Sequence, residues 1–360
     1  MSTHVVNAVR VRVPATSANL GPGLDAFGLA LALYNDVIVR TAPSGAEVTV
    51  EGEGSERFAT GEGNLVVRSV RVALDELGHP VPGLLLHCTN RIPGARGLGS
   101  SAASIVAGVV AGALLGRDAL EGPAGCSGVD GSGGNGSGGN GSALRGSFPG
   151  GLDVDWALEL CARLEGHPDN VAACLLGGVT VAWYDVDGRA RAARADPAPD
   201  LVAVALVPPG RVATADARRL LPQRVTLTDA AHSAGRAALL SMALTSRTDL
   251  LLPATEDRLH QTYRRDAMPE SLALMWRLRD CGLAATISGA GPSVLVLASA
   301  VEDGSALGSG PTPQPGRPYD RHVDLMAAIA AADLAGFAAV PLHPDPRGVQ
   351  VRPVDPQLTR

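Results

Sequence analysis

Residues 93–103 read PGARGLGSSAA, a glycine-rich turn that leads into two serines and a run of small residues. Gly97 and Gly99 allow positive φ angles and close approach of the backbone, so successive N–H groups can point at one anion. A helix that follows such a turn adds the positive end of its dipole, and Ser100 and Ser101 add hydroxyls. The segment therefore predicts a phosphate-binding loop, although an ordinary strand-to-helix turn also uses glycine in this way.

The composition limits the chemistry that the chain can perform. The 360 residues are 46% hydrophobic with a formal net charge of −6, and all 30 cationic residues are arginines because lysine is absent. Without lysine, Schiff-base chemistry, a pyridoxal-phosphate anchor and the lysine of a P-loop are excluded. No basic block is interleaved with aromatic residues, so we expect no nucleic-acid partner.

Cysteine usage and hydropathy predict a cytoplasmic protein that does not interact with membranes. The cysteines show no CxxC pairing, which favours reduced thiols over a disulfide framework or a zinc site. The most apolar segment, 102–115, is shorter than a membrane span. The first residues alternate like a strand and lack the apolar core of a signal peptide.

Hydrophobic periodicity predicts strands and helices that alternate along the chain, in two domains. Strands are expected at 5–13, 33–51, 83–90, 177–186, 201–209 and 348–354, with a strand–turn–strand at 285–298. Helices are expected at 64–78, 101–116, 155–166, 213–220, 229–246, 269–281 and 324–336. Two stretches rich in Gly, 121–151 and 302–318, are expected to be surface loops. We place the domain boundary between residues 1–190 and 191–360.

Three segments, in order across nearly the whole chain, resemble the motifs of the GHMP kinases. They are PATSANLGPGLDAFGLAL at 14–31, the loop at 93–103 and SGAGPSV at 288–294. The form of the first motif, together with EGHPDNVAA at 165–173, resembles the homoserine kinases within that superfamily. Unlike the P-loop enzymes, these kinases hold phosphates without a lysine in the loop.

The resemblance implies an α+β two-domain GHMP kinase fold. Its N-terminal domain would be ribosomal-protein-S5-like with a left-handed βαβ unit and would bind ATP. Its C-terminal domain would be a ferredoxin-like α/β sandwich that contacts the substrate. The implied activity is phosphorylation of the side-chain hydroxyl of L-homoserine by ATP with Mg²⁺, in threonine biosynthesis, and the implied assembly is a homodimer.

In the first motif, the resemblance makes Asn19 and Asp25 substrate-binding residues. An amide suits the reacting hydroxyl, and a carboxylate suits an α-ammonium group. Asn19 could instead close an Asx turn, and Asp25 could cap a helix. In HPDN, His167 and Asn170 would line the substrate pocket while Asp169 orients the loop. Asn170 stands where mevalonate-type relatives carry a catalytic aspartate, so we expect direct in-line attack without a side-chain base.

Two further segments are expected to hold the substrate carboxylate with arginine forks. VATADARRLLP at 212–222 resembles a family segment and assigns Thr214 and Arg218, although the usual serine is Ala213 here. EDRLHQTYR at 256–264 assigns Arg264, with a threonine where that pattern has proline.

The remaining assignments concern ATP and magnesium. The resemblance assigns the phosphates to Pro93, Gly94, Ala95, Arg96, Gly97, Leu98, Gly99, Ser100, Ser101, Ala102 and Ala103. It assigns the adenine side to Asn64 and Val66, and the C-terminal glycine motif to Ser288, Gly289 and Gly291. Magnesium would be held by Ser100 and a glutamate before HPDN, which is Glu165 or, as the alternative, Glu159.

Three other functions fit the sequence less well than this one. Another GHMP kinase could act on a different alcohol, but Asn19, Asp25, Arg218 and Arg264 suit a zwitterionic amino acid better. A catalytically inactive protein of the same fold would not need a metal-binding serine and glutamate. A Rossmann dehydrogenase would need GxGxxG within a βαβ unit and a downstream acidic residue, and the sequence has no GxGxxG in that setting.

Overall fold

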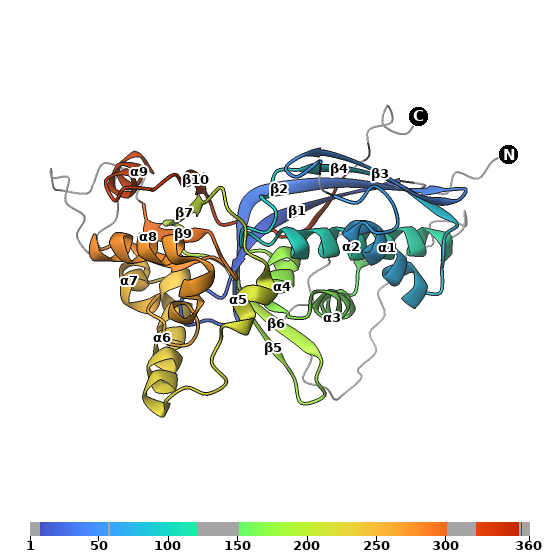
Figure 1. Cartoon of the computed structure of the whole chain (residues 1–360). Coiled ribbons are helices and arrows are strands. Elements are labelled where there is room, and N and C mark those ends of the chain that lie inside the picture. The colour runs from blue at the N-terminus through green and yellow to red at the C-terminus, as the bar shows by residue number, and fades with distance from the viewer. Residues whose placement is uncertain (1–7, 57, 121–150, 301–321, 353, 355–360) are drawn as a thin grey trace.

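The computed structural model describes residues 8–56, 58–120, 151–300, 322–352 and 354 (Figure 1). The two Gly-rich stretches expected to be loops lie outside these residues, apart from Gly151. The described elements form two sheets with helices packed beside them, which confirms the mixed α+β architecture. Among the described helices, none combines the length and apolar character that a membrane span requires.

The first sheet has the strand order β11-β1-β2-β4-β3. Strand β1 (Ala8–Ala18) pairs antiparallel with β2 (Phe27–Ala42), β2 pairs antiparallel with β4 (Gly83–Asn90), and β4 pairs in parallel with β3 (Gly45–Gly52). A hairpin of β5 (Val179–Tyr184) and β6 (Ala190–Ala195) joins the sheet at the start of β2. The valines of β1 are buried and its arginines lie on the opposite face, as its alternating sequence predicts.

Helices cover one face of this sheet (Figure 1). They are α1 (Leu65–Glu76), α2 (Ser100–Leu120), α3 (Val154–Glu165) and α4 (Asp169–Leu176). Small residues let α2 approach α1 closely: a Cβ on Gly108 would lie 2.5 Å from Cβ of Ser69, and one on Gly112 would lie 2.8 Å from Cβ of Ala73. This close packing explains why α2 is rich in Gly and Ala yet nearly all buried where its side chains are described.

The second sheet, in the order β10-β7-β9-β8, is antiparallel throughout. Its strands are β7 (Leu201–Val207), β8 (Ala284–Ile287), β9 (Val294–Ser299) and β10 (Ala338–Leu342). The helices of this half are α5 (Thr214–Arg219), α6 (Leu227–Thr245), α7 (Leu251–Ala254), α8 (Pro269–Asp280) and α9 (His322–Ala330). Two 3₁₀ turns, η2 (Thr248–Leu250) and η3 (Thr262–Ala267), connect them.

The end of the described chain returns to the first sheet. Strand β11 (Gln350–Arg352) pairs antiparallel with β1, with Arg352 opposite Arg10. The hairpin partner β6 also begins where the expected first domain ends. The domain boundary after residue 190 stays a prediction, but the first sheet includes strands on both sides of it.

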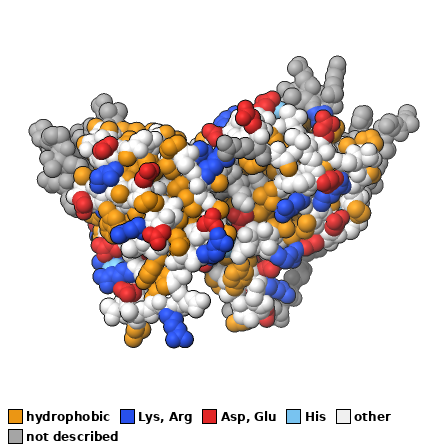
Figure 2. Space-filling model, in the orientation of Figure 1, with side chains coloured by type: hydrophobic (Ala, Val, Ile, Leu, Met, Phe, Trp, Pro, Cys, Tyr) orange, Lys and Arg blue, Asp and Glu red, His pale blue; other side chains and the backbone are white. Residues whose placement is uncertain are grey.

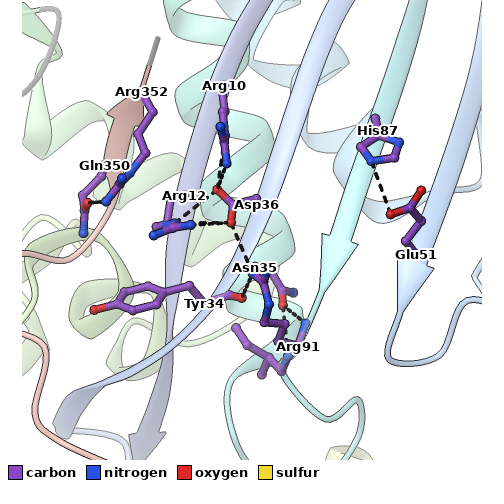
Figure 3. Close-up of polar contacts among 11 residues, drawn as sticks. Arg10, Arg12, Tyr34, Asn35, Asp36, Glu51, His87, Arg91, Gln350 and Arg352 are labelled. Atoms are coloured by element: carbon purple, nitrogen blue, oxygen red, sulfur yellow. Dashed lines mark hydrogen bonds and ion pairs between the residues drawn. The ribbon is translucent and has the colours of Figure 1, made fainter. Parts of the chain in front are cut away.

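On the face of the first sheet opposite the helices, Asp36 gathers three arginines from neighbouring positions (Figure 3). Arg10, Arg12 and Arg91 reach its carboxylate at 3.1, 2.8 and 3.3 Å. Arg12 also lies over the Tyr34 ring, 5.3 Å from its centroid. Burial would raise the pKa of Asp36, but hydrogen bonds and charge from the arginines outweigh it and lower that pKa below its usual value.

Most of the expected elements are present within a few residues of their predicted bounds. The 14–31 motif is mainly strand, because β1 runs to Ala18 and β2 begins at Phe27. Helix α9 ends six residues earlier than predicted, and α4, α7, β6 and β10 were not predicted.

Candidate active site

The three motifs, which lie far apart in the sequence, meet at one place between the two sheets. The backbone N–H of Thr16 donates to the Leu98 carbonyl at 3.1 Å. The Ser288 hydroxyl donates to the Gly97 carbonyl at 2.6 Å, and the Gly289 N–H donates to the Ala18 carbonyl at 2.8 Å. The end of β1 and the turn between β8 and β9 therefore hold the 93–99 loop from two sides.

Two glycines of the loop are required by this close packing. Gly97 has φ of +75°, and a Cβ there would lie 2.2 Å from the Ser288 carbonyl oxygen. Gly99 has φ of +71°, and a Cβ there would lie 1.9 Å from Oγ1 of Thr16. No other residue can adopt this backbone in the space available.

Helix α2 begins at Ser100, directly after these glycines. The first N–H groups of a helix have no carbonyl partner within it, so this end can accept an anion. Nε and Nη2 of Arg96 donate to the carbonyls of Pro208 and Pro209 at 2.9 and 3.0 Å, and a contact of Arg96 with phosphate stays a prediction. These two hydrogen bonds tie the loop to the end of β7.

The loop between β1 and β2 carries the expected substrate residues Asn19 and Asp25, both with positive φ. Oδ1 of Asn19 accepts the backbone N–H of Asp25 at 2.7 Å, so this amide closes the loop, and its Nδ2 is the group left to meet a ligand. Asp25 does not cap a helix. Its half-exposed carboxylate forms an ion pair with Arg218 of α5, in which Nη1 donates to Oδ2 at 3.1 Å and Nη2 donates to Oδ1.

The HPDN segment forms the start of α4. Oδ1 of the fully buried Asp169 lies 2.5 Å from Nδ1 of His167 and accepts the N–H of Asn170 at 2.7 Å. Burial lowers the pKa of His167, but this hydrogen bond and the negative charge of Asp169 outweigh it and raise that pKa above its usual value. Oδ1 of Asn170 accepts the Thr16 hydroxyl at 2.8 Å, which links HPDN to the first motif.

The two glutamates considered for magnesium have different partners. Oε2 of Glu165 accepts the Ser101 hydroxyl at 2.7 Å at the start of α2. Glu159 instead accepts the backbone N–H of Ala190 at 2.6 Å, at the start of β6. Burial raises the pKa of Glu165, opposed in part by the hydrogen bond from Ser101. Glu165 is thus beside the phosphate loop, where it contacts Ser101 rather than Ser100.

The second expected arginine, Arg264, is 1% exposed in η3 and donates to the Gly289 carbonyl at 2.9 Å. Burial, and then the positive charge of Arg218, lower its pKa to about 10. Nε of Arg264 has no hydrogen-bond partner among the described residues. Thr214 is exposed at the first position of α5, where Ala213 provides no side-chain cap.

The expected adenine-side residues are both buried. Asn64 caps α1: its Oδ1 accepts the Val66 N–H at 2.9 Å and its Nδ2 donates to the Ala59 carbonyl at 2.8 Å. The Asn64 side chain is therefore committed to the helix end, and contact with adenine stays a prediction for this segment.

Several residues that build the site were not expected from the sequence. Thr16 contacts Asn170, and the Ser17 hydroxyl lies 2.8 Å from the Ser288 hydroxyl. From the second half of the chain, His260 contacts Gly21 of the first motif, and Gln261 contacts Ile287, directly before the third motif. The first two belong to the PATSAN motif, which was a signal for them. The other two lie within EDRLHQTYR at 256–264, from which only Arg264 was assigned; their partners are more than 20 residues away, and that segment does not specify them.

Comparisons with known proteins identify the class that this fold and site represent. The family model of the GHMP kinases N terminal domain matches residues 64–121, and that of the GHMP kinases C terminal domain matches residues 231–308. The structure of a homoserine kinase from Cytophaga hutchinsonii superposes with a TM-score of 0.72 at 24% identity, covering 98% of this chain and 99% of that one. The fold is therefore that of the GHMP kinases, as the sequence motifs predicted.

Similar curated proteins show which family of GHMP kinases the chain belongs to. Homoserine kinase from Streptomyces avermitilis is 49% identical over 96% of this chain and 96% of its own length. Homoserine kinase from Streptomyces coelicolor is 53% identical over 81% of this chain and 85% of its own length. The chain belongs to the homoserine kinase family.

Proposed function

We propose that this protein transfers the γ-phosphate of ATP to the side-chain hydroxyl of L-homoserine, giving ADP and O-phospho-L-homoserine. The observation that carries the proposal is the Asp25–Arg218 ion pair, which joins the first motif to α5, while Thr16 of the same motif contacts both the phosphate loop and HPDN. A carboxylate and a guanidinium side by side match the ammonium and carboxylate groups of an amino acid. The family membership of the chain supports the same substrate.

In this proposal the phosphates of ATP lie at the start of α2. Backbone N–H groups after Gly99 and the hydroxyls of Ser100 and Ser101 hold their oxygens. No three His, Cys, Asp or Glu side chains gather as a metal site in the described parts of the chain. A magnesium ion held mainly by phosphates needs only one or two carboxylates, and the Glu165–Ser101 pair fits that need. Bound there, the ion would neutralise phosphate charge.

The reacting hydroxyl would lie near Asn170. Because the Asn170 Oδ1 accepts the Thr16 hydroxyl, its Nδ2 is the group available to donate to the substrate oxygen or the transferring phosphoryl group. The substrate oxygen attacks the γ-phosphorus in line, the bond to the bridging oxygen of ADP breaks, and the hydroxyl proton passes to a phosphoryl oxygen. The protein contributes position and charge neutralisation in this scheme.

The substrate carboxylate would lie between Arg218 and Arg264. Burial, and then the positive charge of Arg218, lower the pKa of Arg264, so the two guanidiniums repel each other. A carboxylate between them would relieve that repulsion and give Arg264 a charged partner. The α-ammonium group of the substrate would replace Arg218 as the donor to one of the two carboxylate oxygens of Asp25.

The proposal also includes a cytoplasmic location and a homodimer. Three buried free thiols, Cys88, Cys161 and Cys174, are consistent with a reducing compartment. The dimer rests on the resemblance to homoserine kinases, and sedimentation of the purified protein tests it.

The first test is ADP release from Mg-ATP with a panel of alcohols: L-homoserine, D-homoserine, L-serine, L-threonine, mevalonate and shikimate. We expect strong stimulation by L-homoserine and little by the others. Stimulation by another alcohol would keep the kinase class and overturn the substrate. ATP binding without turnover of any alcohol would favour a binding protein of the same fold.

A further inference from the structure

In the loop that carries Asn19 and Asp25, the backbone of one residue, Gly21, is held at both of its polar groups by side chains from the second half of the chain. Its N–H donates to Oγ1 of Thr286 at 2.8 Å, and its carbonyl lies 2.6 Å from Nε2 of His260. Gly21 has φ of +50°, and a Cβ there would lie 2.8 Å from the backbone of Thr255. Both polar groups of Gly21 are thus held by side chains more than 200 residues away.

The state of His260 follows from this contact. A carbonyl oxygen only accepts, so Nε2 must carry the hydrogen and donate it to Gly21. The ring is fully buried, and its Nδ1 has no hydrogen-bond partner among the described residues. Burial lowers the pKa of His260, which keeps the ring neutral at neutral pH. Among the described residues, the His260 side chain therefore makes one hydrogen bond, from Nε2 to the Gly21 carbonyl.

The backbone around His260 is itself fixed. The Asp257 carboxylate, whose side chain is fully buried, accepts the N–H of His260 at 3.0 Å and that of Gln261 at 2.8 Å. Oε1 of Gln261 in turn accepts the Ile287 N–H at 2.7 Å and the Thr286 hydroxyl at 2.9 Å. The segment 257–261 therefore links the first motif to the end of β8, directly before the third motif, and His260 is the side chain that extends from this segment to the substrate loop.

We infer that His260 is a positioning residue for the amino-acid end of the substrate, acting through the Gly21 carbonyl on the loop that presents Asn19 and Asp25. The inference rests on the proposed function. His260 does not contact the phosphate loop in the described contacts, since its side-chain partners are Gly21 and Asp257. Loss of its donor should therefore weaken L-homoserine binding while ATP binding stays the same.

The test compares three variants of the full-length protein. His260→Leu removes the donor and leaves the buried Gly21 carbonyl unpaired, whereas His260→Gln keeps an N–H donor at a similar reach. Thr286→Val removes the acceptor of the Gly21 N–H, which is the second hydrogen bond that holds Gly21. His87→Leu is the matched control, because His87 lies on the open face of the first sheet (Figure 3).

We expect His260→Leu to raise the KM for L-homoserine about tenfold, with kcat and the Kd for ATP changed less than about twofold. His260→Gln should recover most of that loss, Thr286→Val should raise the same KM, and His87→Leu should match the parent protein. If His260→Leu fails to fold, the test rests on Thr286→Val and His260→Gln. The same comparison is made for them, between the KM for L-homoserine and the Kd for ATP.

Two results would overturn the inference. One is an unchanged KM for L-homoserine in folded His260→Leu, and the other is an equal loss of affinity for ATP and L-homoserine, which would indicate general disruption. Failure of the proposed function is a different result, since the parent protein itself would then show no turnover of L-homoserine.

Discussion

The carboxylate of Asp25 and the guanidinium of Arg218 form an ion pair across the junction of the two halves of the chain, with Nη1 of Arg218 3.1 Å from Oδ2 of Asp25. Asp25 follows β1 and Arg218 lies in α5, 193 positions later. In Figure 2 the two lobes of the molecule are separated by a notch at the lower edge of the view. In the proposed function, this pair supplies one charge of each sign to a zwitterionic substrate.

Replacement of Arg218 tests the role of this pair in substrate binding. Arg218→Ala leaves Asp25 without its cation and removes one proposed partner of the substrate carboxylate, so we expect the KM for L-homoserine to rise about tenfold or more. Steady-state kinetics at saturating ATP measure it. Arg219→Ala is the neighbouring control, because Arg219 is exposed and its ion pair among the described residues is with Asp216 on the surface of α5. Equal effects of the two variants would argue against the pair.

Gly99 offers a test of the phosphate loop. In Gly99→Ala the new methyl group would need to occupy space 1.9 Å from Oγ1 of Thr16, at a φ of +71°, so the loop must move. We expect kcat/KM for ATP to fall about 100-fold. Gly235→Ala, where a Cβ would meet nothing within 4 Å, should have normal kinetics. Normal ATP kinetics in Gly99→Ala would place the nucleotide elsewhere.

The Mg²⁺ requirement of variant enzymes distinguishes the roles of Glu165 and Glu159. Glu165→Gln removes a charge beside Ser101, and we expect the Mg²⁺ concentration for half-maximal rate to rise about tenfold, with partial recovery at high Mg²⁺. Glu159→Ala should instead lower stability by about 1 kcal/mol, because the Ala190 N–H loses its acceptor. A rise in the Mg²⁺ requirement of Glu159→Ala alone would reverse the assignment.

The Asp36 cluster predicts a pH-dependent contribution to stability. The pKa of Asp36 is lowered in the folded protein, so its contribution is complete above the unfolded-state pKa of about 3.9 and is lost as pH falls through the folded-state value. We expect Asp36→Asn to lower the thermal midpoint by about 5 °C at pH 7, a difference that shrinks below pH ~4. A difference that stays constant from pH 7 to pH 3 would exclude the charge as its cause.

The sequence predicts well those parts of the site that depend on local pattern. The glycines before α2 and the small residues within it indicate a loop and a closely packed helix, and both are present. The alternating valines of β1 likewise indicate a strand with one buried face. Each of these features is determined by residues within about ten positions of one another.

Elements whose signals are weak or distant were missed. Strand β6, ARAARA, has no β-branched residues, and β10, AAVPL, contains a proline, so neither has a typical strand sequence. The return of β11 to β1 joins residues 342 positions apart, Arg10 and Arg352, and depends on the tertiary fold. The contact of His260 with Gly21 likewise depends on the tertiary fold, because the two residues lie 239 positions apart.

For two residues, the side-chain contacts in the structure are not those that the resemblance implies with ligands, and the ligand contacts stay predictions. The resemblance pairs magnesium with Ser100, but Glu165 contacts Ser101, one position further into α2. It gives Arg96 to the phosphates, but that guanidinium is bound to Pro208 and Pro209. Both differences follow from side-chain direction, which a linear motif does not specify.

Identification of the product tests the central claim most directly. The purified protein would be incubated with Mg-ATP and L-homoserine, and the product would be examined by phosphorus NMR and mass spectrometry. The account predicts one phosphomonoester on the side-chain oxygen of L-homoserine, formed in equal amount to ADP. Phosphate released to water, or a phosphoryl group on the substrate carboxylate, would contradict it.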